Sequence, residues 1–145
     1  MSMSRMLQTL GLMVAFTIQG NAAEVVSIRA VPDGKAMNVI TAIKTSKAET
    51  IYHVWIYAGK TSGGTVAVYD ATIKAMRNAD QTDLDWLKER KIEGARMIVR
   101  LPVMPSPSYY TRSQKTVDEK AFGLWKVQVY DSTNLMPIGE IGLID

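Results

Sequence analysis

The side chains that could carry out chemistry are few in this chain. Its 145 residues include no cysteine and one histidine, His53. A thiolate zinc site, a cysteine nucleophile and a disulfide framework are therefore excluded, and so are metal sites that need two imidazole ligands. The carboxylates are scattered, and those near residues 80–93 are expected on a solvated helix face. We predict no metal site and no cofactor.

His53 is the side chain whose ordinary pKa lies nearest to neutral, so it is the candidate general base of a hydrolase. A Ser-His-Asp triad could be composed on paper from Ser113, His53 and Asp131. However, the chain has no Gly-x-Ser-x-Gly elbow, and nothing in the spacing brings the three residues together. We therefore expect no catalytic residue and interpret His53 as a hydrogen-bonded histidine of the core.

The amino terminus has the order of features found in a secretory signal peptide. One positive charge, Arg5, precedes a mostly apolar stretch at 6–18, and small residues follow at 20–23. The apolar stretch is shorter than the ~20 residues needed to span a bilayer. We expect a signal peptide over residues 1–22, cleaved after Ala22; cleavage one residue later and retention as an anchor are the alternatives. An exported domain without cysteine or a glycosylation sequon fits the bacterial periplasm.

The remainder of the chain is close to charge balance. The full chain has 17 Lys and Arg and 14 Asp and Glu, a net charge of +3, and loss of Arg5 with the signal peptide would leave +2. Because nucleic-acid-binding proteins usually carry a concentrated basic patch, we expect no nucleic-acid partner. No later stretch is long and apolar enough to cross a bilayer, so we expect no transmembrane segment after signal cleavage.

Alternation of apolar residues predicts seven or eight short strands. Residues 50–58 are bulky at both sets of alternating positions, which favours a central strand, and residues 122–130 have one cleaner apolar face. Turn signals at intervals of roughly 8 to 12 residues favour a mainly β fold, an antiparallel immunoglobulin-like β-sandwich, as a single domain over residues 23–145. Its expected core includes His53, Trp55, Trp125, Val127 and Val129.

Residues 70–93 have a different composition, rich in the helix formers Ala, Lys, Met, Leu and Glu. Thr82-x-x-Asp85 resembles a capping box, and Gly94 is a natural helix stop. We predict one or two short helices here, as an insertion into the sandwich.

Three segments carry a family resemblance. They are ETIYHVWIYAGK at 49–60, LPV at 101–103 followed by SPSYYTRSQK at 106–115, and GLWKVQVYD at 123–131. In this order they resemble three strands of the domain-of-unknown-function 2914 family, with its His-x-Trp, aromatic and Arg/Thr/Ser-rich, and Gly-x-Trp-x-Val signatures. The resemblance implies a small extracytoplasmic bacterial β domain with no established activity and no catalytic residues.

This chain departs from the family pattern at two places. The family joins its first two signatures by a short stretch, whereas residues 65–97 intervene here and look like an insertion. Tyr109-Tyr110 stands where the family tends to have Trp-Arg, and Arg112 follows two positions later.

Two segments combine aromatic and cationic side chains, a combination enriched at protein interfaces. The candidate partner-binding residues are Trp86, Lys88 and Arg90 in the insertion and Tyr109, Tyr110 and Arg112 in the strand that follows it. The structural alternatives are an indole that packs the insertion onto the sheet and an exposed strand edge.

These expectations favour a noncatalytic periplasmic module that binds another envelope protein through a sheet edge or through the insertion. A carbohydrate- or peptidoglycan-binding module is the first alternative, since Tyr and Arg can stack on sugar. A hydrolase that uses His53 is the second. The expected partner is thus an envelope protein or a cell-wall polymer.

Overall fold

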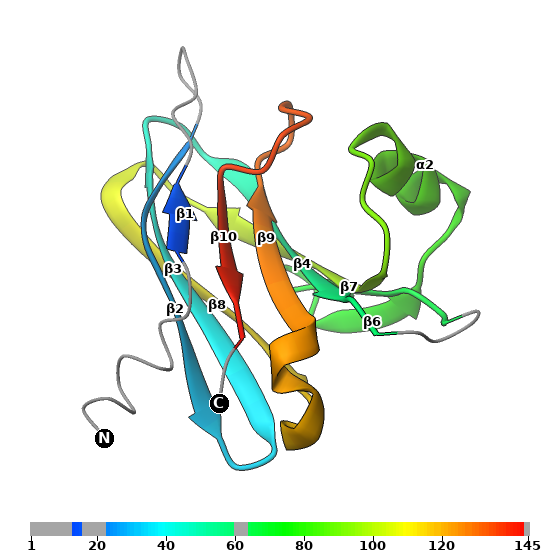
Figure 1. Ribbon diagram of the computed structural model, residues 1–145. Helices are drawn as coiled ribbons and strands as arrows, with labels where there is room; N and C mark the ends of the chain where they lie inside the picture. Colours follow the sequence, from blue (N-terminus) through cyan, green and yellow to red (C-terminus); the bar gives the residue numbers. More distant parts are fainter. Residues whose placement is uncertain (1–12, 16–22, 60–63, 144–145) are drawn as a thin grey trace.

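The computed structural model describes residues 13–15, 23–59 and 64–143. Within these residues the chain is mainly β, as predicted, with two sheets, one α-helix and a short 3-10 helix (Figure 1). The larger sheet has seven strands in the order β1-β10-β9-β4-β7-β5-β6, and the smaller has three in the order β2-β3-β8.

The bounds of the elements follow the two sheets. The seven-stranded sheet contains β1 (Met13–Ala15), β10 (Gly139–Gly142), β9 (Trp125–Tyr130), β4 (Glu49–Tyr57), β7 (Ala95–Val103), β5 (Ala67–Asp70) and β6 (Ala75–Asn78). The three-stranded sheet contains β2 (Glu24–Asp33), β3 (Ala36–Thr45) and β8 (Ser106–Thr116). The helices are α2 (Gln81–Glu89) and the 3-10 helix η1 (Glu119–Leu124).

The sheets are antiparallel except at one pair. β5 and β7 run parallel, with Tyr69 opposite Val99, so the prediction of an antiparallel sandwich is wrong at this pair. The reason is the connection between the two strands. β6 and α2 return the chain to the end at which β5 began, so β7 starts in the same direction as β5.

The main core lies between the two sheets. Apolar side chains from the facing sides of both sheets form one buried cluster, which includes Val39 and Ile43 of β3 and Trp55 of β4. Val127 and Val129 of β9 are fully buried in it. Strand β4 lies between β9 and β7, which confirms the prediction of a central strand from its two bulky faces.

The opposite face of the seven-stranded sheet is covered by α2. Val54 and Ile56 of β4 form a second buried cluster with Leu87 of the helix, and Trp86 packs against it. The alternate residues of β4 therefore enter two different cores, because successive side chains of a strand point to opposite faces.

The helical insertion is shorter than predicted. Within residues 70–93 only Gln81–Glu89 is α-helical, and Ala75–Asn78 is a strand paired with β5. Pairing with a neighbouring strand outweighs the helix propensity of the Ala, Met and Arg side chains there.

The capping residues of this helix also differ from the prediction. The box is formed by Asp80 and Asp83, whereas Thr82 lies in the first turn. Gly94 is not the helix stop: it lies just before β7 with φ of +81°, where a Cβ atom would meet the Tyr57 carbonyl oxygen at 2.5 Å.

The amino-terminal residues are described only in part. Met13–Ala15 falls within the predicted signal peptide and pairs antiparallel with β10. Residues 1–12 and 16–22 lie outside the described ranges, and the signal peptide stays a prediction. Among the helices of the described residues, none has the length and apolar character needed to span a membrane.

Candidate binding cleft

The two sheets differ in width, and a cleft lies where the wider one extends past the narrower one. Figure 1 shows β6 reaching well to the right of the three-stranded sheet. We call this end of the larger sheet, β5 and β6 with the adjoining residues of β7, the overhang. A cavity of about 340 Å³ lies between this overhang and strand β8. Its lining residues are Tyr69, Met76, Met97, Val99, Arg112, Ser113 and Gln114.

The floor of the cleft is an apolar row on the inner face of the overhang. Tyr69 is opposite Met76 on one side and opposite Val99 on the other. Val99 belongs to the main core and Tyr69 is packed against it, whereas Met76 is 58% exposed. The row thus continues from the core to the solvent, and its outer end is left without the cover that the smaller sheet gives to the rest.

The wall of the cleft is the open edge of β8. Within the described residues β8 pairs with β3 alone in its sheet. Val117 N–H donates to the Lys35 carbonyl just beyond the strand ends, at 3.3 Å. Because the direction of backbone groups alternates along an antiparallel pair, the N–H and C=O groups of Tyr110, Arg112 and Gln114 point away from β3.

The side chains of the two cationic residues of β8 lie on opposite faces of the smaller sheet. Lys115 lies on the inner face, with its Nζ 4.7 Å from the Trp125 ring centroid, and burial, together with the charge of Arg96, lowers its pKa. Arg112 is exposed and lines the cleft. It forms no ion pair with any residue of the described part of the chain.

A buried polar network lies directly behind Ser113. His53 Nδ1 is 2.6 Å from the Ser113 Oγ, and His53 Nε2 is 3.1 Å from the Thr41 Oγ1. Trp55 Nε1 donates to the same Ser113 Oγ at 3.0 Å. A neutral imidazole has one donor and one acceptor nitrogen, so the two hydroxyl groups satisfy both. Complete burial lowers the pKa of His53 to about 3.

The structure brings together two members of the triad that the spacing gave no reason to join. Ser113 and His53 are in contact, but Asp131 is not part of the network. Its carboxylate accepts hydrogen bonds from the backbone of Thr133 and from the backbone and side chain of Asn134. Sequence spacing could not predict this contact, because it joins strands of two different sheets.

In the insertion, the aromatic residue of the predicted binding surface, Trp86, faces the larger sheet. The Trp86 ring centroid lies 4.9 Å from that of Tyr52 and 5.5 Å from that of Tyr130, both on the large sheet. The guanidinium of Arg90 lies over the indole ring, with its Cζ 4.1 Å from the ring centroid, while Lys88 is exposed. Trp86 therefore packs the helix onto the sheet.

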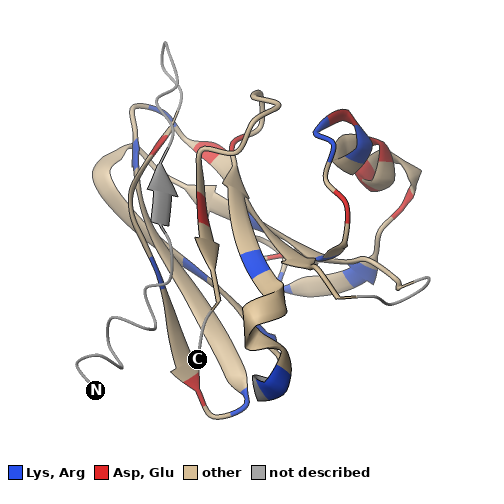
Figure 2. Cartoon of the chain, viewed as in Figure 1, with Lys and Arg blue, Asp and Glu red and all other residues tan. Residues whose placement is uncertain are grey.

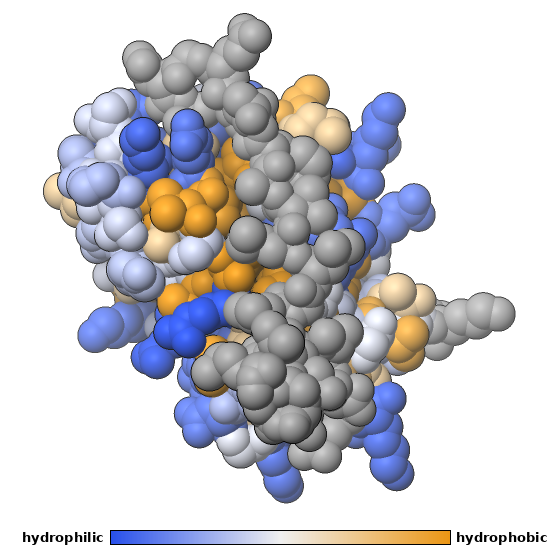
Figure 3. All heavy atoms as spheres, turned by 60° about the vertical axis from the view of Figure 1, so that its left-hand side comes forward, coloured by the Kyte–Doolittle hydropathy of each residue, from blue (hydrophilic) through white to orange (hydrophobic). Residues whose placement is uncertain are grey.

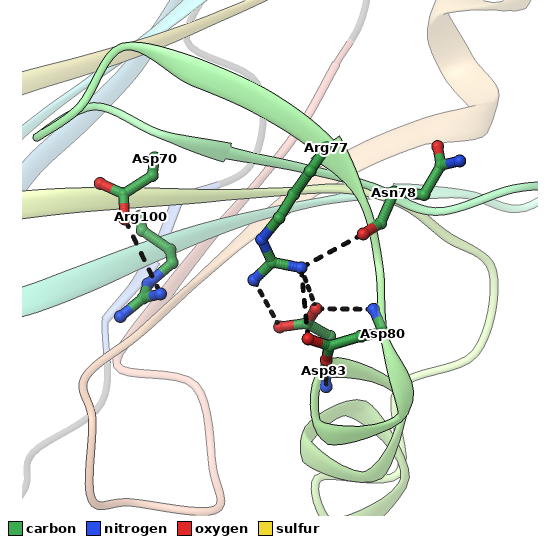
Figure 4. Close-up of polar contacts among 6 residues, drawn as sticks. All are labelled: Asp70, Arg77, Asn78, Asp80, Asp83 and Arg100. Carbon is green, nitrogen blue, oxygen red and sulfur yellow. Dashed lines mark hydrogen bonds and ion pairs between the residues drawn. The ribbon is translucent and has the colours of Figure 1, made fainter.

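On the face opposite the cleft, Arg77 of β6 contacts acidic residues at the start of α2 (Figure 4), and Figure 2 shows where the charged residues of these two segments lie. Arg77 of β6 lies 2.6 Å from the Asp83 carboxylate and 3.7 Å from that of Asp80. Asp70 pairs with Arg100 at 3.8 Å. Partial burial alone would raise the pKa of Asp83, but hydrogen bonds from Arg77 and from the Asp80 backbone lower it.

Of the remaining predicted residues, Tyr109 and Trp125 are partly buried against the main core, and Tyr110 is 65% exposed on the outer face of β8. Figure 3 shows apolar atoms reaching the surface on another side of the molecule, next to the residues drawn in grey. We assign no site there. No group of His, Cys, Asp or Glu side chains suited to a metal ion occurs in the part of the chain that the structure describes.

Comparison with known proteins adds no relative: no family model matches the chain, and neither a curated protein nor a solved structure is significantly similar to it. The resemblance to the domain-of-unknown-function 2914 family stays a prediction that depends on the three quoted segments.

Proposed function

We propose that the protein is a noncatalytic binding module of the bacterial envelope and that it holds another envelope protein in the cleft beside β8. The observation that carries this proposal is the unpaired edge of β8 above an apolar floor, in a cavity of about 340 Å³. Binding clefts in proteins are typically a few hundred Å³ in volume and combine apolar walls with a few polar groups. The predicted signal peptide supports the location.

The packing of Trp86 favours the sheet edge over the insertion as the binding surface. An interface anchor is most effective when its aromatic side chain is free to enter a pocket of the partner. Trp86 already contacts Tyr52, Tyr130 and Arg90. By contrast, Met76 and Arg112 of the cleft are both exposed.

The state of His53 supports a noncatalytic role. A general base needs a pKa near the working pH and access to its substrate. His53 is fully buried, its pKa is lowered to about 3, and both of its ring nitrogens contact hydroxyl groups of the fold.

The proposal is tested by affinity capture from an envelope extract of the source bacterium, with the full chain immobilised. Met76→Glu and Arg112→Glu are expected to lose proteins that the wild type retains. Arg29→Glu is the matched control, because Arg29 lies on the same outer face and in the same cross-strand row as Arg112, but on the far strand β2. If all four chains retain the same proteins, the cleft is not the binding site.

A carbohydrate-binding module is the second candidate, and the exposure of Tyr110 favours it. An exposed aromatic ring next to a cation is suited to stacking on a sugar. Tyr110 is exposed on the outer face of β8, as Arg112 is, but it is not among the residues that line the cleft. Cosedimentation with purified peptidoglycan that is lost in Tyr110→Ala but kept in Met76→Glu would favour this function over the first.

A further inference from the structure

We propose, building on the proposed function, that the cleft takes an extended acidic segment of the partner protein, which adds to β8 as a fourth strand of the smaller sheet. The proposal follows from three features of the cleft: the direction of the backbone groups along β8, the apolar floor, and the charge of the outer face.

The first feature is a row of backbone groups with no partner strand. The two-residue turn at Gly34 and Lys35 makes Asp33 and Ala36 a hydrogen-bonded pair of β2 and β3. Ala36 therefore points its backbone groups away from β8, and the residue opposite it, Thr116, points its own away from β3. This agrees with the bond from Val117 to Lys35 and places the groups of Arg112 and Gln114 at the open edge.

The second feature determines the inner face of the added strand. A strand beside β8 would lie over the overhang, at the place where the smaller sheet ends. Its inward side chains would be neighbours of Ser113 and would contact Tyr69 and Met76 below. Because only every second residue of a strand faces inward, the segment is expected to carry apolar side chains at alternate positions. Their burial would cover Met76, which is now 58% exposed.

The third feature determines the outer face. Strand β8 contains Arg112 and Lys115 and no acidic residue. Lys115 is engaged with Trp125, whereas Arg112 has no ion pair within the described residues. Residues directly opposite on neighbouring strands interact through their side chains, so an Asp or Glu opposite Arg112 would be favoured.

The same charge disfavours a second copy of this chain as the occupant. Two β8 strands related by a two-fold axis over the cleft would place one Arg112 opposite or diagonal to the other. Like charges at these positions destabilise a pair of strands. A partner with complementary charge is therefore the occupant that the surface fits best.

The test uses random peptides of about the length of β8, which has 11 residues, selected for binding to the full chain. Enriched peptides are expected to alternate apolar residues and to contain Asp or Glu. Their affinity is expected to fall about tenfold in Arg112→Glu, because repulsion replaces an ion pair, and to be unchanged in Arg29→Glu.

Hydrogen exchange then reports whether the peptide adds as a strand. With peptide bound, the amides of Tyr110, Arg112 and Gln114 are expected to exchange at least about tenfold more slowly than in the free protein. The amides of Thr111 and Ser113 already face β3 and are expected to change little. Unchanged exchange at the three edge amides would overturn the strand proposal.

Proline substitution tests the same point independently. Gln114→Pro removes an edge N–H that β3 does not use, so binding is expected to be lost while β8 keeps its pairing with β3. Thr116→Pro is the matched control at the end of the strand, outside the residues that line the cleft. If Gln114→Pro does not fold, the exchange measurement on the wild type decides.

The outcomes separate this inference from the proposed function. Binding that depends on Met76 and Arg112 but leaves the edge amides unprotected would overturn the added strand and leave the cleft as the binding site. Absence of any cleft-dependent partner or peptide would overturn both. Protection of the edge amides on dimerisation of the chain without peptide would identify a second copy as the occupant and overturn the partner segment.

Discussion

His53 Nδ1 on the larger sheet lies 2.6 Å from Ser113 Oγ on the smaller sheet. The contact crosses the main core, and the bond from Trp55 to the same hydroxyl group reinforces it. Ser113 is also part of the wall of the cleft. The buried network therefore fixes the position of β8, whose open edge is the feature proposed to bind a partner.

The stability of the fold is expected to fall in acid because of His53. The unfolded chain binds a proton near the ordinary pKa of 6.5, whereas folded His53 stays neutral down to about 3. The contribution is therefore complete above pH 6.5 and decreases as the pH falls from there, by on the order of 1 kcal/mol per pH unit. Urea denaturation of the wild type and His53→Gln at several pH values measures it. An identical pH dependence in the two proteins would contradict the buried neutral state.

Replacement of Ser113 is expected to weaken the fold strongly for a residue of its size. Ser113→Ala would leave His53 Nδ1 and Trp55 Nε1 buried without their partner. Each unsatisfied buried group costs about 1–3 kcal/mol, so a loss of about 2–4 kcal/mol in the free energy of unfolding is expected. Ser108→Ala on the same strand is exposed and is expected to change it by less than about 0.5 kcal/mol. Equal effects would show that the network is not formed.

The hydrolase hypothesis makes a separate prediction at the same residue. Ser113 is only 5% exposed, and its hydroxyl group contacts His53 and Trp55. A fluorophosphonate probe for activated serines is therefore expected to leave the native protein unlabelled. Intact-protein mass spectrometry measures the adduct, and an adduct that disappears in Ser113→Ala would favour the hydrolase instead.

The strand content and the central position of β4 could be predicted because each depends on local alternation and bulk. The two bulky faces of residues 50–58 required cover on both sides, and the structure provides a sheet on one side and α2 on the other. The β5–β6 pair could not be predicted in this way. Its residues have helix propensity, and their strand conformation depends on neighbours that are distant in the sequence.

For the same reason, the cleft could not be predicted from local sequence patterns. The residue types of Arg112 and Tyr110 mark them as candidates, but the roles of Met76 and Tyr69 depend on how far one sheet extends past the other. Residue types alone allow Ser113 to be placed in a triad with His53, but local patterns cannot predict their contact, because it joins residues 60 positions apart. The width of each sheet and the pairing between layers are set by the whole chain.

The helix start provides a direct comparison of the predicted and observed caps. The Asp80 carboxylate accepts a hydrogen bond from the Asp83 N–H at 3.0 Å, and the Asp83 carboxylate accepts one from the Asp80 N–H at 2.9 Å. Asp80→Ala is expected to lower the free energy of unfolding by about 1 kcal/mol. Thr82→Ala is expected to lower it by less than about 0.5 kcal/mol, because Thr82 is exposed within the first turn. A larger loss in Thr82→Ala would favour the cap predicted from the sequence.

Trp86 is expected to act on stability and not on partner binding. Its indole packs against Arg90 and the rings of Tyr52 and Tyr130, so Trp86→Ala should lower the free energy of unfolding by about 2–4 kcal/mol. Lys88→Ala, on an exposed position of the same helix, should change it by less than about 0.5 kcal/mol. Circular dichroism during urea denaturation measures both. Under conditions where Trp86→Ala is still folded, it should retain the partners that Arg112→Glu loses, because the helix and the cleft lie on opposite faces of the larger sheet. If folded Trp86→Ala lost these partners, the binding surface would lie on the insertion and not in the cleft.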